Sequence, residues 1–162
     1  MTQNDRIYGN TYDITIILKY KASIYYIMTH TLDYWSQYLQ PDDYEYVIEY
    51  VENIKNNRKN DKMMILSGPG RSGKSTLIRD IFSCIGKDEC IYCGQDGSEI
   101  YGPLYKLWNV CDISDQTKKK NIQLFENLID YNQSIISDTP HVERVNSRIL
   151  AKSRIIRMEH VF

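Results

Sequence analysis

The sequence predicts an α/β protein in which helices cover both faces of a mainly parallel sheet, preceded by a small helical N-terminal segment. Three observations lead to this three-layer fold class. Short apolar runs alternate with helix-like stretches from residue 63 onward. A glycine-rich loop follows the first run and opens a helix. Before it, apolar residues recur at helical spacing. We therefore divide the 162 residues into a helical segment, 1–60, and a core domain, 61–162.

The composition is that of an ordinary soluble globular domain. Apolar residues make up 42% and charged residues 25%, and the net charge of −1 gives no overall field that attracts nucleic acid. No apolar run is long enough to span a bilayer, and the polar opening "MTQNDRIYGN" is no secretory signal. These features predict an intracellular protein with reduced cysteines and no membrane contact.

Two helical stretches are expected in the N-terminal segment. Residues 12–39 carry apolar and aromatic side chains at near-helical spacing, and Pro41 ends this stretch. Asp42 is expected to cap a second helix, whose apolar face runs from Tyr44 to Ile54. The polar run "NNRKND" that follows reads as a linker. We interpret the aromatic stripe of the first stretch as packing against the core, with a ligand groove and a partner or self-association surface as the alternatives.

Strands and helices alternate in the core domain. The run "MMILS", residues 63–67, is apolar without alternation, which is typical of a strand buried on both faces. The helix expected at 116–130 has Ile122, Phe125 and Leu128 on one face. The other elements are strands at 90–93, within 105–113, at 134–137 and at 154–162, and a helix at 74–85. Strands separated by helices favour parallel pairing.

The stretch "GPGRSGKST" has the spacing of a phosphate-binding loop and lies between a strand and a helix. Glycines allow the tight turn that aims backbone N–H groups inward, and the helix N-terminus adds partial positive charge. Lys74 is expected to reach the β- and γ-phosphates of ATP, and the Ser75 hydroxyl to bind Mg²⁺. The predicted nucleotide contacts are Gly68, Pro69, Gly70, Arg71, Ser72, Gly73, Lys74, Ser75 and Thr76.

A second metal contact is expected at Asp112, near the end of a predicted strand. Hydrolytic proteins of this class often place a glutamate directly after that aspartate, to activate water, and here Ile113 stands there. Cys90 and Cys93 form a C-x-x-C pair, but the second pair that a zinc site needs is missing.

Three stretches, "GPGRSGKSTLIRDIFSCIG", "KLWNVCDI" and "IISDTPHVERVNSRILAKSRIIRMEHVF", resemble the core of the viral superfamily 3 helicases, which are AAA+-type ATPases. The resemblance covers roughly residues 62–162 and points to the primase–helicase group of large DNA viruses. It implies ATP hydrolysis in DNA replication, a homo-oligomeric ring, and a place in the host cytoplasm or viral factory.

The resemblance also implies roles for individual residues. Asp112 becomes the Walker B acid, and Asp138 falls where the family's sensor asparagine orients water near the γ-phosphate. Arg154 falls where the family places an arginine finger that reaches a neighbouring subunit's nucleotide, and Arg148 is a second candidate. The implied catalytic set is Lys74, Asp112, Asp138 and Arg154.

The chain departs from the family's pattern in four ways. No glutamate follows Asp112, and an aspartate replaces the asparagine at 138, which weakens the case for hydrolysis. The interval between Asp112 and Asp138 has room for little more than one helix, and no primase or origin-binding pattern precedes the core. The last two departures weaken the case for DNA unwinding.

Three functions remain open from the sequence. The first is an ATP-binding, AAA+-like protein with weak or partner-dependent hydrolysis. The second is a nucleoside or nucleotide kinase, with the arginine-rich tail as a lid. The third is a nucleotide-binding scaffold without turnover. Support for nucleic-acid binding is limited to the basic run 118–120 and the basic tail, which usually form solvated surfaces.

Overall fold

The computed structural model describes residues 14–19, 21, 31–93 and 105–162. Its centre is a five-stranded sheet in the order β2-β3-β4-β1-β5. Every pair of neighbouring strands is parallel. The strands are β1 (Met63–Ser67), β2 (Cys90–Cys93), β3 (Leu107–Cys111), β4 (Ile135–Thr139) and β5 (Ser153–Arg157). The predicted α/β class with a parallel sheet is confirmed.

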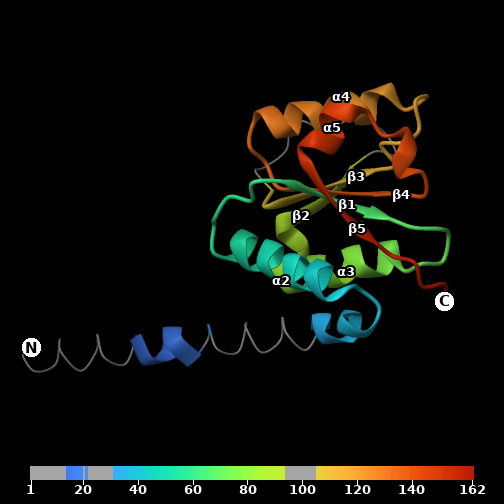
Figure 1. Ribbon diagram of the computed structural model, residues 1–162. Coiled ribbons are helices and arrows are strands. Elements are labelled where there is room, and N and C mark those ends of the chain that lie inside the picture. The colour runs from blue at the N-terminus through green and yellow to red at the C-terminus, as the bar shows by residue number, and fades with distance from the viewer. Residues whose placement is uncertain (1–13, 20, 22–30, 94–104) are drawn as a thin grey trace, which may run out of the picture.

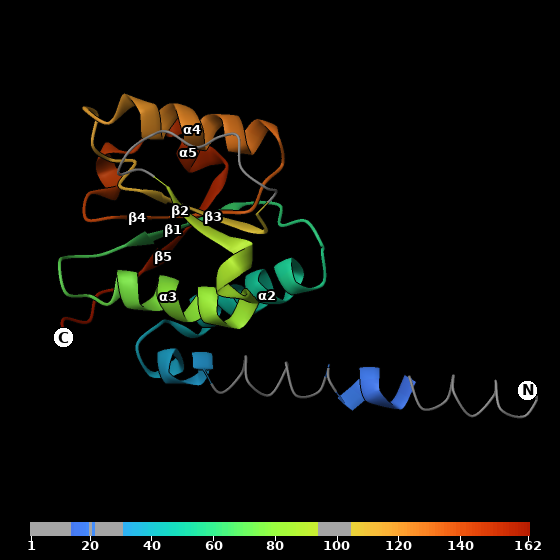
Figure 2. The same cartoon turned by 180° about the vertical axis from the view of Figure 1, so that it is seen from behind.

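Helices cover both faces of the sheet, as Figures 1 and 2 show. One face carries α2 (Pro41–Lys55) and α3 (Lys74–Ile85), and the other carries α4 (Lys119–Asp130) and the short α5 (Ser147–Ala151). Short 3-10 turns are η1 (Tyr34–Gln37), η2 (Lys87–Glu89) and η3 (Val142–Arg144).

Strand β1 shows why an apolar run without alternation forms the centre of this sheet. Met64 and Leu66 pack into the cluster beneath α2 and α3, whereas Met63 and Ile65 pack into the cluster beneath α4 and α5. Side chains alternate along a strand, so both faces of β1 need apolar residues when both are covered.

Several helix and strand boundaries differ from the expectation; β4, for example, covers 135–139 rather than 134–137. Asp42 does not cap α2: Gln40 holds the N-cap position without a side-chain bond, and Pro41 is the first helical residue. Helix α4 begins at Lys119 rather than at 116, because the Asp115 carboxylate bonds Thr117 and forms a turn there. Strand β5 ends at Arg157, and the residues after it continue without regular structure.

The N-terminal segment shares the core of the sheet through its second half. Leu32, Trp35 and Leu39 lie in the same buried cluster as α2 and α3, which agrees with the packing interpretation of this part of the aromatic stripe. The other part of the stripe falls mostly outside the described residues. Ile17 and Leu18, which lie in the helical stretch 14–19, have half or more of their surface exposed.

Among the helices that the structure describes, none has the length and apolar character needed to cross a membrane.

Candidate functional site

The strand order brings three predicted residues to one edge of the sheet. Strand β4 lies between β1 and β3, and Asp138 pairs in register with Leu66 on one side and with Cys111 on the other. The phosphate loop leaves β1 after Ser67, the residue that follows Leu66, and Asp112 directly follows Cys111. Lys74, Asp112 and Asp138 therefore gather at the carboxyl ends of three adjacent strands, where open α/β sheets bind ligands.

The loop between β1 and α3 turns through two residues with left-handed backbone. Arg71 and Gly73 have left-handed φ values of 63° and 90°. Such backbone turns point successive N–H groups into a concave site for anions. The first N–H groups of α3 have no acceptor within the helix and carry its partial positive charge. Gly68 is needed for close approach, because a Cβ there would lie 2.1 Å from the Met158 carbonyl oxygen.

Lys74 is buried and folds back over this loop. Its Nζ donates to the carbonyl oxygens of Gly68 at 2.6 Å and Pro69 at 2.8 Å. Burial lowers its pKa, while the nearby carboxylates of Asp138 and Asp112 act in the opposite direction. The ammonium group thus lies where the loop, the helix N-terminus and two acidic side chains converge.

Asp112 is held by a turn immediately after β3. Its φ of 30° is left-handed, and its Oδ1 accepts from the Ser114 N–H at 3.2 Å and hydroxyl at 2.5 Å. One carboxylate oxygen is therefore fixed by Ser114. Ile113, which replaces the expected glutamate, is completely buried in the cluster under α4. The Asp115 carboxylate instead accepts from the N–H and the hydroxyl of Thr117.

Asp138 is a half-buried carboxylate beside Lys74. Burial raises the pKa of Asp138, the Lys74 ammonium lowers it, and the Asp112 carboxylate raises it further. The next residue, Thr139, ties β4 to the loop because its carbonyl oxygen accepts from the Gly68 N–H at 3.3 Å. The site therefore holds two carboxylates and one ammonium group near one another.

Arg154 lies apart from these three residues. It pairs with Met64 in β1, toward the amino end of the sheet, whereas the loop begins after the other end of β1. Its guanidinium donates to Asp43 of α2 at 3.1 Å and lies 4.8 Å from the centre of the Tyr46 ring. In the described chain its Nε is buried without a hydrogen-bond partner.

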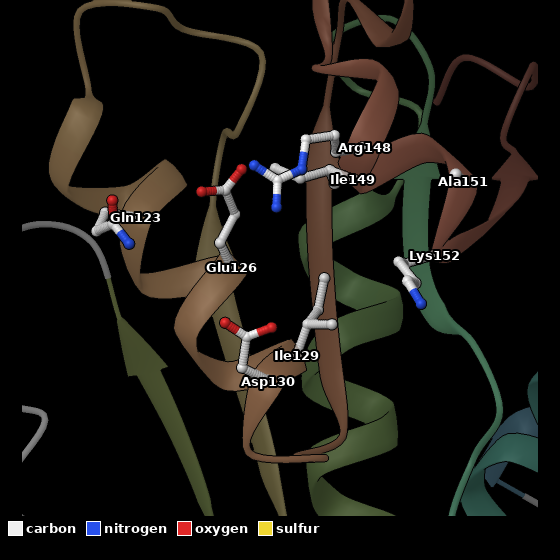
Figure 3. Close-up of a pocket in the computed structure, with 8 residues that line it drawn as sticks. All are labelled: Gln123, Glu126, Ile129, Asp130, Arg148, Ile149, Ala151 and Lys152. Carbon is white, nitrogen blue, oxygen red and sulfur yellow. The ribbon is translucent and has the colours of Figure 1, made fainter.

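Arg148 lines a separate hollow of about 470 Å³ between α4 and α5. Its guanidinium points toward Glu126 of α4, and Asp130 and Lys152 lie at the other end (Figure 3). Ile129 and Ile149 contribute apolar surface. The phosphate loop contributes none of the lining residues, so this hollow is distinct from the candidate site.

The C-x-x-C pair lies on β2 with its two sulfurs on opposite faces of the sheet. Cys90 belongs to the cluster under α3 and Cys93 packs against the cluster under α4. Burial also raises the pKa of the Cys90 thiol to about 12, which disfavours the thiolate that a metal would need. In the described ranges, no group of three or more His, Cys, Asp or Glu residues could hold a metal ion.

Two aromatic residues at the loop were not predicted as site residues. Gly73 packs against the rings of Trp35 and Phe162, and the Phe162 N–H donates to the Arg71 carbonyl oxygen at 2.9 Å. The sequence offered only a weak signal for them: an aromatic stripe before the core, and a tail that the apolar pattern assigned to a strand.

The residues present fit a magnesium–nucleotide. The loop offers a concave backbone and a buried lysine for phosphates, as described above. Ser75 is exposed in the first turn of α3. Ser114 bonds only Oδ1 of Asp112, so the second carboxylate oxygen of Asp112 and the Ser75 hydroxyl are able to approach a metal ion. Hydroxyl and carboxylate oxygens are the ligand types that Mg²⁺ prefers.

No family model and no curated protein sequence matches the chain. Solved structures do match in fold. The FIGL-1 AAA domain in complex with ADP has a TM-score of 0.55 at 11% identity, over 77% of this chain and 55% of that chain. The Thermotoga maritima RuvB Holliday junction branch migration motor has a TM-score of 0.57 at 16% identity, over 77% of this chain and 46% of that chain.

The replication initiator DnaA, bound to AMPPCP and single-stranded DNA, has a TM-score of 0.54 at 16% identity, over 75% of this chain and 47% of that chain. The chain thus spans about half the length of the structures it matches. These neighbours are AAA+ P-loop ATPases, and they share the parallel five-stranded sheet and its covering helices. The chain has the AAA+ P-loop NTPase fold.

Proposed function

We propose that the chain binds ATP with Mg²⁺ at loop 68–76 and hydrolyses it slowly or with the help of a partner. The observation that carries this proposal is the convergence of Lys74, Asp112 and Asp138 at the loop end of the sheet. Lysine at this place in a phosphate loop binds the β- and γ-phosphates. The ADP and AMPPCP bound to two of the fold neighbours support a nucleotide as the ligand.

Each residue of the site has a role in this proposal. Loop N–H groups and Lys74 would hold the phosphate chain, and Ser75 and Asp112 would hold the metal. Bound Mg²⁺ would neutralise charge on the β- and γ-phosphates. In hydrolysis, water attacks the γ-phosphorus in line and the bond to the β–γ bridging oxygen breaks. Of the two carboxylates that act on the Lys74 ammonium, Asp138 has the larger effect, and it is our candidate for orienting that water.

The same geometry supports slow turnover. The position that usually supplies a water-activating glutamate is Ile113, and its side chain is buried away from the site. Asp138 places negative charge where the family's neutral sensor stands, and it would repel a γ-phosphate unless Lys74 or a proton compensates. A nucleotide-binding scaffold without turnover is therefore the second candidate.

A more specific function, in DNA replication or remodelling, rests on the sequence resemblance. We propose a relationship to the viral superfamily 3 helicases, with a role in DNA replication or remodelling and a ring in which Arg154 acts on a neighbour's nucleotide. Within this proposal Arg154 must leave Asp43 on assembly. The exposed Lys118, Lys119 and Lys120 at the start of α4 are the surface that we assign to nucleic acid.

The first test is titration calorimetry with ATP and Mg²⁺. We expect Lys74→Ala to abolish measurable binding, because it removes the buried ammonium from the phosphate site. Lys87→Ala is the matched control, since Lys87 is an exposed lysine outside the loop, and it should bind like the wild type. Equal binding by Lys74→Ala and the wild type would refute the site.

The second test is an ATPase assay with and without single-stranded DNA. Turnover that DNA stimulates and Lys74→Ala abolishes would support the motor. ATP binding without turnover under either condition would favour the scaffold. A phosphorylated nucleoside appearing in a substrate screen would instead support the kinase.

A further inference from the structure

We propose that Trp35 and Phe162 are positioning residues for the phosphate loop. They hold the backbone of residues 71–73 in the conformation that presents N–H groups to a phosphate chain. This inference rests on the proposed function for its ligand. It assigns to an N-terminal and a C-terminal residue a part in nucleotide binding that neither the loop motif nor the other site residues indicate.

The loop backbone needs support from its surroundings. Arg71 has a φ of 63°, a left-handed backbone conformation that residues other than glycine rarely adopt. Gly73 follows with a φ of 90°. Glycine adopts such a φ readily, but a residue such as Arg71 persists there only where neighbouring structure holds it. The contacts made by 71–73 should therefore include the groups that determine the loop's shape.

Phe162 supplies two of these contacts. Its backbone N–H donates to the carbonyl oxygen of Arg71 at 2.9 Å. Its ring lies against Gly73, where an added Cβ would come within 3.0 Å of a ring carbon. The C-terminal segment also ends beside the start of α3 in both ribbon views (Figures 1 and 2). Phe162 thus touches both left-handed residues of the loop.

Trp35 supports the same point and connects it to α3. An added Cβ on Gly73 would lie 2.8 Å from a carbon of the buried indole ring. The indole Nε1 donates to the Asp80 carboxylate of α3 at 2.8 Å. Because α3 begins at the end of the loop, this bond fixes the indole relative to the helix N-terminus that would face the phosphates.

Other rings hold Phe162 in place. The rings of Tyr38, His160 and Phe162 lie pairwise within 4.6 to 4.9 Å, centre to centre. Trp35 meets Phe162 edge-on at 6.2 Å. Aromatic pairs at these separations are favourable. The rings therefore form one cluster from two distant parts of the chain, and the loop packs against it.

The first experiment measures hydrogen exchange of the loop amides in the full chain without added nucleotide. We expect Phe162→Ala to speed exchange across residues 71–75 by about tenfold, because the loop samples open conformations more often. Phe162→Tyr keeps the ring and should restore the wild-type rates. Tyr131→Ala is the control, since Tyr131 is an aromatic residue with 74% of its surface exposed, outside the cluster. Unchanged exchange in Phe162→Ala would overturn the proposal.

The second experiment compares the affinities of ATP and inorganic tripolyphosphate by calorimetry. A positioning role predicts that Phe162→Ala and Trp35→Phe weaken both ligands by similar factors, roughly three- to tenfold. Loss of affinity for ATP alone would overturn the proposal in favour of a contact with the base. If the wild type binds neither ligand, the proposed function fails, and the exchange experiment still decides whether the two rings hold the loop.

Discussion

At the scale of single residues, the unusual feature is the carboxylate of Asp138 next to Lys74. Its pKa is raised mainly by burial, so the native state disfavours the charged form. The attraction of Lys74 offsets part of this cost. Any phosphate bound by Lys74 would compete with Asp138 for the same ammonium group.

We expect Asp138→Asn to bind ATP more tightly than the wild type by roughly fivefold, an energy of about 1 kcal/mol. The substitution removes a negative charge and keeps the side-chain shape. Calorimetry at neutral pH tests the change. Weaker binding by the variant would mean that the carboxylate helps to organise the site.

The same substitution should change how stability depends on pH. Because the native pKa of Asp138 is raised, the wild type loses free energy of unfolding as pH rises from the unfolded pKa through the native pKa. Asp138→Asn lacks this loss, so its stability relative to the wild type should increase over that interval. Urea unfolding at acidic and neutral pH measures the difference.

Gly68 leads to a second prediction at this scale. Its added Cβ would meet the Met158 carbonyl at 2.1 Å, and Met158 cannot withdraw freely because its N–H donates to Ser67 at 2.7 Å. We expect Gly68→Ala to lower the free energy of unfolding by about 1–3 kcal/mol. Gly70→Ala is the control, because no atom lies within 4 Å of its added Cβ. Equal melting temperatures for the two variants would contradict this account.

The sequence identified the parts of the site that depend on local pattern. Lys74 and its loop follow from spacing alone, and Asp112 follows from its place after an apolar run. Trp35 and Phe162 could not be found this way, because their contact with Gly73 depends on how two distant segments pack. The placement of Arg154 against Asp43 likewise depends on how β5 and α2 meet in space.

At the scale of elements, α2 shows how a helix of the N-terminal segment is fixed to the sheet. The predicted apolar face ran from Tyr44 to Ile54. Val47, Val51 and Ile54 of this face are buried, whereas Tyr44 and Ile48 are half-buried. Tyr50, which that pattern omitted, is also buried, and its hydroxyl donates to the Ile135 carbonyl oxygen of β4 at 2.7 Å. Burial raises the pKa of this hydroxyl, so it remains a neutral donor.

We expect Tyr50→Phe to destabilise the fold by about 1–2 kcal/mol, because a buried carbonyl loses its side-chain donor. Tyr131→Phe alters an exposed hydroxyl and should change stability by less than about 0.5 kcal/mol. Chemical denaturation of both variants measures the contrast. A negligible effect at Tyr50 would show that water or the sheet replaces the bond.

The sequence predicted the ends of helices and strands correctly where a single sequence pattern, such as an apolar run or the glycine-rich loop, determines them. The predicted strand at 63–67 and helix at 74–85 match the structure, because an apolar run and the loop define their starts. The start of α4 and the end of β5 did not match, since the side-chain bonds of Asp115 and the packing of the tail decide them. The strand order has no local signal, because it depends on which crossovers fit the sheet.

At the scale of the whole molecule, the remaining prediction concerns assembly. In the ring that we propose, Arg154 acts on the nucleotide of a neighbouring subunit, so turnover there requires two copies with different roles. We expect Arg154→Ala to reduce turnover more than ATP affinity, and mixing it with Lys74→Ala to restore part of the activity. In the mixture, Lys74→Ala subunits supply the arginine and Arg154→Ala subunits supply the site.

Turnover of the mixture and light scattering with ATP and Mg²⁺ test this prediction together. A strictly monomeric mass, or a mixture no more active than its components, would remove the role of Arg154. Because Arg154 also bonds Asp43, the melting temperature of Arg154→Ala must be compared with that of Asp43→Asn. Similar losses would assign the stability effect to the ion pair.

The position of β1 between β4 and β5 has a consequence for the timing of structural fluctuations. This strand is hydrogen-bonded on both sides and covered on both faces, so it belongs to the part of the sheet that opens only when the whole fold is lost. Strand β2, at an edge of the described sheet, is free to fray alone. The phosphate loop is therefore attached to a strand that we expect to open later than β2, so the β2 edge of the sheet should exchange while the base of the loop stays in place.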